Sequence, residues 1–444
     1  MIRPTVSLFT HALLFAVLAQ LAPTASAQLV RQTEAERVGL TRAWFTQGAI
    51  DSSRHTVAGV AIHGDVLYVL SSASNLQAID TNTGQSLWSL RVGDSRLPAH
   101  GPSVGLYNSN KKADEAAKEK VGVAIVNGSS LYIVDHETGR EFSERVIKGA
   151  PAGAPVLSAN HCFVTLFNGQ LHGYPIDETA VTIWRRSTSG TVYNSPSIAG
   201  SRVFWSTDRG ELFGARLIDL VADFKLSGVG QLVAPAASLG DHGYFASEEG
   251  FLYAINAERG HLDWRASVGA SLEMPPLAIG GVVYQSTHEP ALHAFDASTG
   301  AELWVAPGVV ECVARSNERL YALNDTGALM VLDAATGELI DRLTPTGDQT
   351  AVANNQTDRI FLVTPSGLIQ CLHETGLQKP LSHTGAPVEE AAEEQPSPEP
   401  AAEDPFAEPA EDGDFGAEEE PFEPAEPEDS PAEDDPFDDP FADF

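Results

Sequence analysis

The chain of 444 residues repeats one short pattern eight times. Its clearest copy, LHAFDASTGAELW, runs from Leu292 to Trp304. An alternating segment is followed by turn residues and by a second segment that ends in a large aromatic, which predicts a β-hairpin. The opening leucine recurs at intervals of 55, 40, 41, 40, 40, 37 and 39 residues, at Leu76, Leu131, Leu171, Leu212, Leu252, Leu292, Leu329 and Leu368. A repeat of about 40 residues built from short strands predicts a β-propeller.

Two features of the hairpin recur in other copies. An acid or its amide stands at the turn in five of the eight copies, where it can accept backbone N–H groups. Gly300 supplies the positive φ that a tight turn requires. An aromatic residue closes several copies: Trp88, Trp264 and Trp304 align, Phe224 replaces tryptophan in one copy, and Trp184 comes one residue late.

The pattern D-x-x-T-G-x-x-L-W resembles the repeat of the pyrroloquinoline-quinone (PQQ)-type propellers. DTNTGQSLW at Asp80 to Trp88 and DASTGAELW at Asp296 to Trp304 match it throughout, and the resemblance extends over about residues 40–380. In that family the tryptophan docks between adjacent blades. The resemblance therefore implies blade-docking roles for Trp44, Trp88, Trp184, Phe224, Trp264 and Trp304.

The predicted fold is all-β: an eight-bladed propeller of four-stranded antiparallel blades. The last repeat has Pro380 where its outer-strand aromatic would stand, and proline impairs a central ladder. Leu40 to Gly48 at the other end looks like an outer strand, with Trp44 in the docking position. We therefore predict that this N-terminal strand completes the last blade and closes the ring. Seven blades remain an alternative if a degenerate second or fourth copy is absorbed.

The two ends of the chain differ from the repeat region. Residues 1–27 contain an apolar run and end in Ala25-Ser26-Ala27, which predicts a secretory signal peptide. Residues 28–383 form the predicted propeller. Residues 384–444 contain 24 of the 61 acids and no Lys or Arg, which leaves 37 acids against 27 bases elsewhere. This composition predicts a disordered acidic tail, and the lack of a basic stripe argues against nucleic acid as a partner.

The tail repeats the tripeptide Asp-Pro-Phe, and its aromatic residues suit weak multivalent contact with a basic partner. The candidate contacts are Phe406, Phe422, Phe437 and Phe441. The alternative is that the tail makes no specific contact and only keeps the protein soluble.

A charged insertion centred on residues 108–120 has the composition of a short exposed helix. It should protrude from one face of the disc, either as a solvated decoration or as an element that docks a partner.

Residues that could carry chemistry are few. Cys162, Cys312 and Cys371 lie on strand-like stretches, where buried small hydrophobes are the favoured interpretation over a disulfide. His288 and His293 flank a turn at a spacing that fits no metal pair. Glu273 and Glu311 are the acids to inspect near the expected channel lining of Pro155, Pro196, Pro235, Pro276 and Cys312.

The resemblance to quinoprotein dehydrogenases implies a PQQ- and calcium-dependent enzyme only if their site residues are present. The adjacent cysteines and long inserted loops of that family are missing here, so no catalytic, cofactor or metal residue is assigned. The chain also resembles the cofactor-free BamB type, the outer-membrane assembly propellers, although it lacks a lipid-attachment cysteine. The prediction is an exported, monomeric, non-catalytic scaffold, periplasmic or extracellular, that binds envelope or outer-membrane proteins; the alternatives are a PQQ-dependent dehydrogenase and a glycan-binding or glycan-active propeller.

Overall fold

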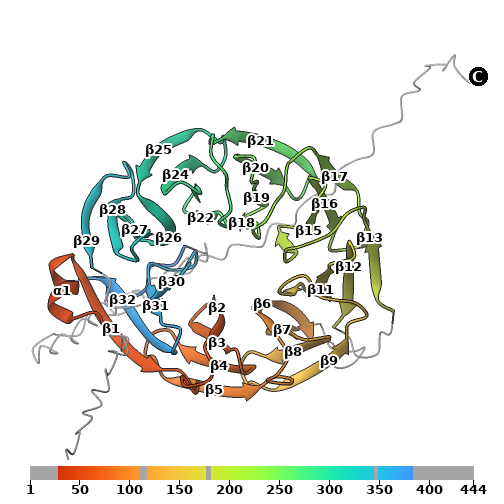
Figure 1. Cartoon of the computed structure of the whole chain (residues 1–444), viewed down its shortest axis with the longest axis horizontal. Coiled ribbons are helices and arrows are strands. Elements are labelled where there is room, and N and C mark those ends of the chain that lie inside the picture. Colours follow the sequence, from red (N-terminus) through yellow and green to blue (C-terminus); the bar gives the residue numbers. More distant parts are fainter. Residues whose placement is uncertain (1–28, 110–117, 177–181, 345–348, 384–444) are drawn as a thin grey trace, which may run out of the picture. The chain divides into compact units, whose positions relative to one another are not determined.

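The structure is a computed structural model that describes residues 29–109, 118–176, 182–344 and 349–383. The chain divides into two compact units, residues 1–388 and 389–444, and all described residues lie in the first. Eight four-stranded antiparallel sheets surround a central axis in this unit (Figure 1). The prediction of an eight-bladed propeller is confirmed, and the seven-bladed alternative is wrong.

Within each blade the first strand of the sheet lies next to the channel and the last lies at the rim (Figure 1). The first four blades comprise β2 (Val57–His63), β3 (Val66–Ser71), β4 (Asn75–Asp80), β5 (Ser86–Arg91); β6 (Ala99–Ser109), β7 (Lys118–Asn127), β8 (Ser130–Asp135), β9 (Glu141–Val146); β10 (Val156–Leu157), β11 (His161–Leu166), β12 (Gln170–Pro175), β13 (Trp184–Ser187); and β14 (Ser197–Ala199), β15 (Arg202–Thr207), β16 (Glu211–Arg216), β17 (Phe224–Ser227).

The remaining four blades follow the same order, except that the last takes its rim strand from the N-terminus. They comprise β18 (Ala237–Leu239), β19 (His242–Ala246), β20 (Phe251–Asn256), β21 (His261–Ser267); β22 (Leu277–Ile279), β23 (Val282–Ser286), β24 (Ala291–Asp296), β25 (Glu302–Pro307); β26 (Val309–Arg315), β27 (Arg319–Asn324), β28 (Leu329–Asp333), β29 (Leu339–Leu343); and β30 (Thr350–Val352), β31 (Ile360–Val363), β32 (Leu368–Glu374), β1 (Leu40–Gln47).

The turn of the sixth blade shows why the repeat keeps an acid. Asp296 Oδ1 accepts hydrogen bonds from the backbone N–H groups of Ser298 (3.0 Å) and Thr299 (2.8 Å) and from both hydroxyls. These bonds stabilise the carboxylate and lower the pKa of Asp296 to about 2. The prediction that the acid at the turn accepts backbone N–H groups is therefore confirmed for Asp296.

The tryptophans of the repeat lie at the seams between blades. Trp264 of the fifth blade donates its Nε1–H to the carbonyl of Ala297 in the sixth, at 3.0 Å. Gly300 has a φ of +72°, and a Cβ atom there would lie 2.6 Å from the Trp264 ring. The turn glycine is therefore required both by its backbone conformation and by the indole packed against it.

The same hydrogen bond is repeated at three other seams. Trp44, Trp88 and Trp304 donate to the carbonyls of Thr81, His136 and Ala334. The third and fourth blades differ: Trp184 packs edge-on against Phe163 within its own blade, and Phe224 packs against Phe204.

The ring is closed by the N-terminal strand. β1 pairs antiparallel with β32, with Leu40 opposite Glu374 and Trp44 opposite Cys371. A short helix that the repeat pattern did not predict, α1 (Gln32–Arg37), precedes β1 and lies beside β29 at the rim (Figure 1). Arg37 donates to Asp341 Oδ1 at 3.1 Å and to the carbonyl of Arg342 at 2.9 Å. The first residues of the propeller thus contact its seventh and eighth blades.

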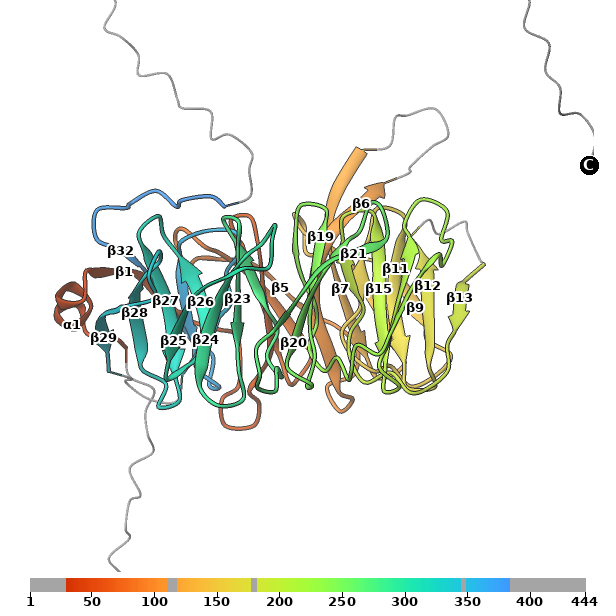
Figure 2. The ribbon, with the colours of Figure 1, turned by 90° about the horizontal axis from the view of Figure 1, so that it is seen from above.

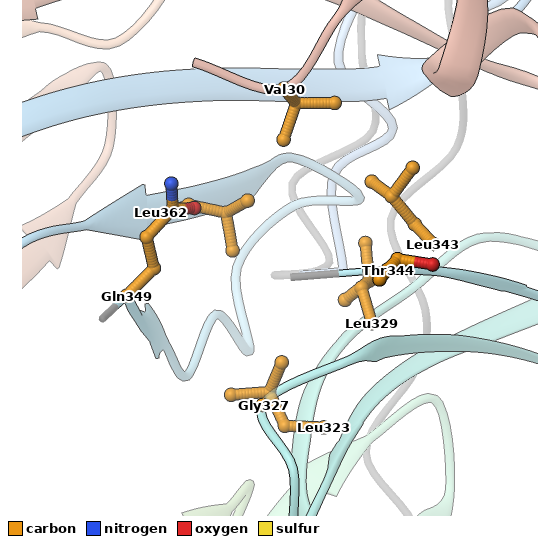
Figure 3. Close-up of a pocket in the computed structure, with 8 residues that line it drawn as sticks. All are labelled: Val30, Leu323, Gly327, Leu329, Leu343, Thr344, Gln349 and Leu362. Atoms are coloured by element: carbon orange, nitrogen blue, oxygen red, sulfur yellow. The ribbon is translucent and has the colours of Figure 1, made fainter. Parts of the chain in front are cut away.

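Val30 lies at the seam between these two blades, together with Leu343, Leu362 and their neighbours (Figure 3). Its backbone N–H donates to Gln370 Oε1 at 3.1 Å. The hole left beside it measures about 10 Å³, at or below the size needed to hold one water. This cavity is a packing gap rather than a binding site.

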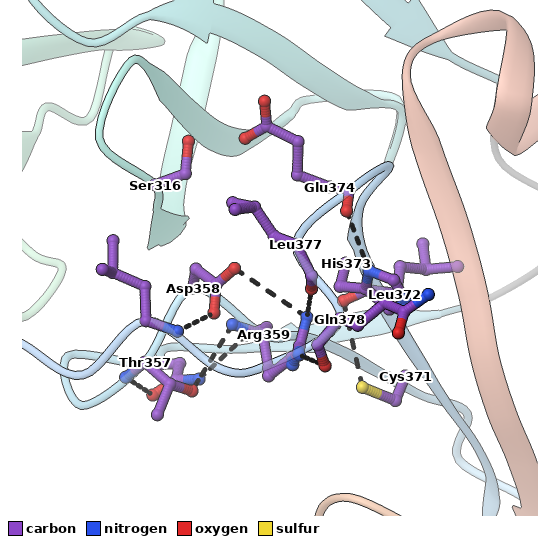
Figure 4. Close-up of polar contacts among 12 residues, drawn as sticks. Ser316, Thr357, Asp358, Arg359, Cys371, Leu372, His373, Glu374, Leu377 and Gln378 are labelled. Carbon is purple, nitrogen blue, oxygen red and sulfur yellow. Dashed lines mark hydrogen bonds and ion pairs between the residues drawn. The ribbon is translucent and has the colours of Figure 1, made fainter. Parts of the chain in front are cut away.

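A buried ion pair holds the segment that leaves the last blade (Figure 4). Arg359 donates to the carbonyls of Leu377 (2.9 Å) and Gln378 (2.5 Å), and Asp358 Oδ1 accepts the N–H of Leu381 at 2.8 Å. Nη1 of Arg359 lies 3.8 Å from Oδ2 of Asp358. We call Asp358 and Arg359 the exit clamp.

The insertion after the first strand of the second blade differs in part from its prediction. Residues 108–109 and 118–120 belong to β6 and β7, so the expected helix is wrong at both ends, and residues 110–117 lie outside the described part of the chain. The ends of β6 and β7 beside the insertion extend past the neighbouring strands, toward one face of the disc (Figure 2).

Candidate interaction site

The channel wall contains a cavity where the innermost parts of the sixth, seventh and eighth blades meet. Its volume is about 120 Å³. Glu311 and Cys312 on β26 form one wall, and Ala353, directly after β30, lies at another side. The sixth blade contributes Met274, Pro275, Pro276, Leu277, Tyr284 and Ser286. We call this cavity the Glu311 pocket.

The local sequence explains the pocket's shape. Pro275 and Pro276 precede β22 and cannot donate ladder hydrogen bonds, so the strand begins only at Leu277. β26 carries register shifts between Val309 and Glu311 and again between Cys312 and Ala314. Such irregularities bend a strand and re-aim its side chains. Both effects occur at the wall of the cavity.

Glu311 is the acid of this pocket. Its side chain is half-buried, and burial raises its pKa to about 6 because desolvation disfavours the charged form. Across the described residues, no hydrogen bond or ion pair reaches its carboxylate. The pocket therefore combines apolar walls with one carboxyl group that has no protein partner there.

Glu273, the other acid that the sequence suggested, lies elsewhere. It precedes Met274 but does not line the pocket, and its side chain is exposed. His288 Nδ1 lies 3.1 Å from Glu273 Oε1, whereas His293 Nδ1 lies 2.6 Å from Glu302 Oε1. Each of these histidines has its own carboxylate partner, so the structure does not bring the two together.

The three cysteines are buried free thiols. Burial raises the pKa of Cys371 to about 12 and raises the pKa values of Cys162 and Cys312 as well. A thiol held in its protonated form is a poor nucleophile. The interpretation of these residues as buried small hydrophobes agrees with their positions, although Cys312 also lines the Glu311 pocket.

A second hollow of about 480 Å³ lies between the innermost strands of the first and last blades. It is lined by Thr56 to Val60 and Thr350 to Ala353, with Thr364 and Pro365, none of which is titratable. Ala353 belongs to both hollows. The repeat pattern gave no indication of either cavity, because each is built from residues of separate blades.

The described residues hold neither a metal-binding cluster nor a membrane-spanning helix. They contain no group of three or more His, Cys, Asp or Glu side chains placed to hold a metal ion. In the same part of the chain, no helix has both the length and the hydropathy needed to span a bilayer.

Two predictions lie outside the described residues. They are the signal peptide at residues 1–27 and the candidate tail contacts Phe406, Phe422, Phe437 and Phe441.

Comparison with known proteins agrees with the propeller geometry. Residues 219–317 match the family described as outer membrane protein assembly factor BamB. BamB of Moraxella catarrhalis has a similar structure, with a TM-score of 0.57 and 15% sequence identity, over 75% of this chain and 97% of that one. The chain carries a PQQ-like propeller that is similar to the BamB family over residues 219–317. This propeller includes the Glu311 pocket, of which all lining residues except Ala353 lie in the matched segment.

Curated relatives of the propeller match over shorter stretches. BamB of Shewanella oneidensis is 39% identical over 62 residues, which are 14% of this chain and 16% of that protein. BamB of Bordetella pertussis is 26% identical over 169 residues, 36% of this chain and 43% of that protein. The chain thus matches less than half the length of each.

One similar protein has a different description. Tetrathionate hydrolase of Acidithiobacillus ferrooxidans is 27% identical over 164 residues, 30% of this chain and 33% of that protein. An enzyme therefore shares part of this repeat, and the BamB-like propeller alone does not decide activity.

Proposed function

We propose that this protein is an exported, non-catalytic scaffold of the cell envelope that takes part in outer-membrane protein assembly. The observation that carries the proposal is the match of residues 219–317 to the BamB family. The apolar character of the Glu311 pocket supports a binding role, because its lining offers one carboxyl group beside Tyr284 and Cys312, whose raised pKa values keep both protonated near pH 7. The partners would be envelope or outer-membrane proteins.

We further propose that residues 1–27 direct export to the periplasm or the cell surface, and that residues 384–444 form an acidic tail with repeated Asp-Pro-Phe contacts. Aromatic residues spaced along an acidic chain would bind weakly one at a time and more strongly together. The other role for this tail is solubility alone, and truncation separates the two.

The test is affinity purification from an envelope extract of the native host, with the full mature chain and with a chain that lacks residues 384–444. Recovery of barrel-assembly components by both chains, in a smaller amount without the tail, is the expected result. Equal recovery would leave the tail a solubility role alone, and recovery by the full chain alone would assign the whole contact to the tail. Recovery of polysaccharide without those components would contradict the proposal in favour of glycan binding.

The second candidate function is an enzyme, which the similarity to tetrathionate hydrolase favours. Purified protein is incubated with tetrathionate, and separately with PQQ, Ca²⁺, a redox dye and small alcohols or sugars. The scaffold proposal expects no substrate loss and no dye reduction. Turnover in either assay would overturn it.

A further inference from the structure

We infer that the Glu311 pocket binds the side chain of a lysine presented by a protein partner. The inference rests on three observations: a cavity of about 120 Å³, apolar walls, and a single carboxyl group without a partner among the described residues. It deepens the proposed binding role by naming the chemistry that the channel recognises.

The volume agrees with a lysine side chain. About 120 Å³ is roughly ten times the minimum of about 10–15 Å³ that one water needs, so the pocket has room for several non-hydrogen atoms. A lysine side chain has four methylene groups and one ammonium group, and it buries its aliphatic stem along apolar surface while its head seeks a polar partner. Met274, Pro275 and Pro276 provide the apolar surface, and Glu311 provides the polar partner.

The charge of the pocket favours a cation. Cys312 and Tyr284 are the other titratable residues of the lining, and burial raises the pKa of each, so both are neutral near pH 7. Arg315, further along β26, interacts electrostatically with Cys312 and Tyr284. Glu311 is therefore the one lining group whose charge changes between pH 5 and pH 8. An ammonium group beside Glu311 would favour its ionised form and offset the cost of burial.

The mouth of the pocket is accessible. Ala353 and Met274 are both exposed, and Met274 is 38% exposed although it is a large apolar residue. A lysine on a protruding loop could therefore enter from the channel. A guanidinium group is a poorer match, because it carries five N–H donors against three for an ammonium group, and a single carboxylate in an otherwise apolar lining leaves more of them without an acceptor.

The chain contains three methionines, which provides a direct probe. Met274 lines the pocket, whereas Met330 is buried in β28 and does not line it. We would label the full mature chain with ¹³C-methyl methionine and titrate it with N-acetyl-lysine methylamide. The expected result is a saturable shift of the Met274 signal with an unchanged Met330 signal.

Matched variants and ligands decide between lysine recognition and nonspecific contact. Glu311→Gln keeps the shape of the side chain and is expected to weaken binding at least about tenfold, whereas Glu273→Gln, at an exposed acid outside the pocket, is expected to leave it unchanged. Ala353→Phe would cover the mouth and should also abolish the shift. The uncharged analogue N-acetyl-norleucine methylamide should bind at least about tenfold more weakly than the lysine compound.

The pH dependence gives an independent readout. Protonation of Glu311 removes the attraction, so lysine binding is expected to weaken as the pH falls from 8 through about 6. Equal shifts with the norleucine analogue, tighter binding of the arginine analogue, an unaltered affinity in Glu311→Gln, or no Met274 shift at all would overturn the inference. Because the probe is a small ligand, these outcomes leave the envelope purification and the proposed function unaffected.

Discussion

Removal of residues 28–50 is expected to destroy the cooperative melting of the propeller. These residues include α1 and β1, whose side chains Leu40 and Trp44 are buried at the junction of the ring. Truncation of a buried leucine typically costs about 2–5 kcal/mol and of a buried tryptophan about 3–5 kcal/mol. Their sum is comparable to the whole stability of an ordinary domain, about 5–15 kcal/mol.

The deletion would also expose the edge of β32, which β1 covers from Leu40 to Gln47. An uncovered edge strand is a site of aggregation. The measurement is differential scanning calorimetry of the deleted and full chains, with a chain lacking residues 384–444 as the control for loss of length. A melting transition in the deleted chain that matches the full chain would show that the ring closes in another way.

Replacement of Arg359 by methionine is expected to destabilise the propeller by about 3–5 kcal/mol, because it leaves the buried carboxylate of Asp358 without its counter-charge. The carbonyls of Leu377 and Gln378 also lose their donors. For about 350 residues, the usual entropy of about 2.1 cal/mol/K per residue converts this loss into a decrease in Tm of about 4–7 °C.

The matched control for Arg359→Met is the double variant Asp358→Asn, Arg359→Met. The asparagine keeps an acceptor for the N–H of Leu381 but carries no charge. We expect the double variant to recover part of the lost stability in chemical denaturation, which a double-mutant cycle would detect. The exit clamp would contribute little if the losses in free energy of unfolding from the two substitutions simply add. The same conclusion would follow if Arg359→Met unfolds within about 1 kcal/mol of the original protein.

The repeat predicted the fold because its determinants are local. The side chain of Asp296, the backbone conformation of Gly300 and the indole of Trp304 lie within one 13-residue stretch. Even the closure could be predicted, because Pro380 leaves the last blade without a rim strand and Leu40 to Gly48 provides one. The observed strand ends at Gln47, one residue earlier than predicted.

The candidate site could be predicted only in part. Glu311 was singled out as a channel acid, but its pocket combines three blades through residues as distant as Met274 and Ala353. No repeat relates these positions, so nothing in the sequence shows that they meet. The sequence did not predict the exit clamp either. Asp358 and Arg359 bind backbone groups of the exit segment, which follows the last repeat and has no counterpart in the other copies.

The most direct test of ring closure is a disulfide between the two ends of the propeller. Thr41 on β1 and Thr375 after β32 have hydroxyl oxygens 3.0 Å apart, so the sulfur atoms of cysteines at these two positions can approach each other to form a bridge. We predict that the variant Thr41→Cys, Thr375→Cys forms an intramolecular disulfide under mild oxidation, detected by mass spectrometry as one linked pair of peptides. Thr41→Cys, Thr138→Cys, with the second cysteine in the turn of the second blade, should remain reduced. Two free thiols at positions 41 and 375, or only intermolecular bridges, would contradict the closure.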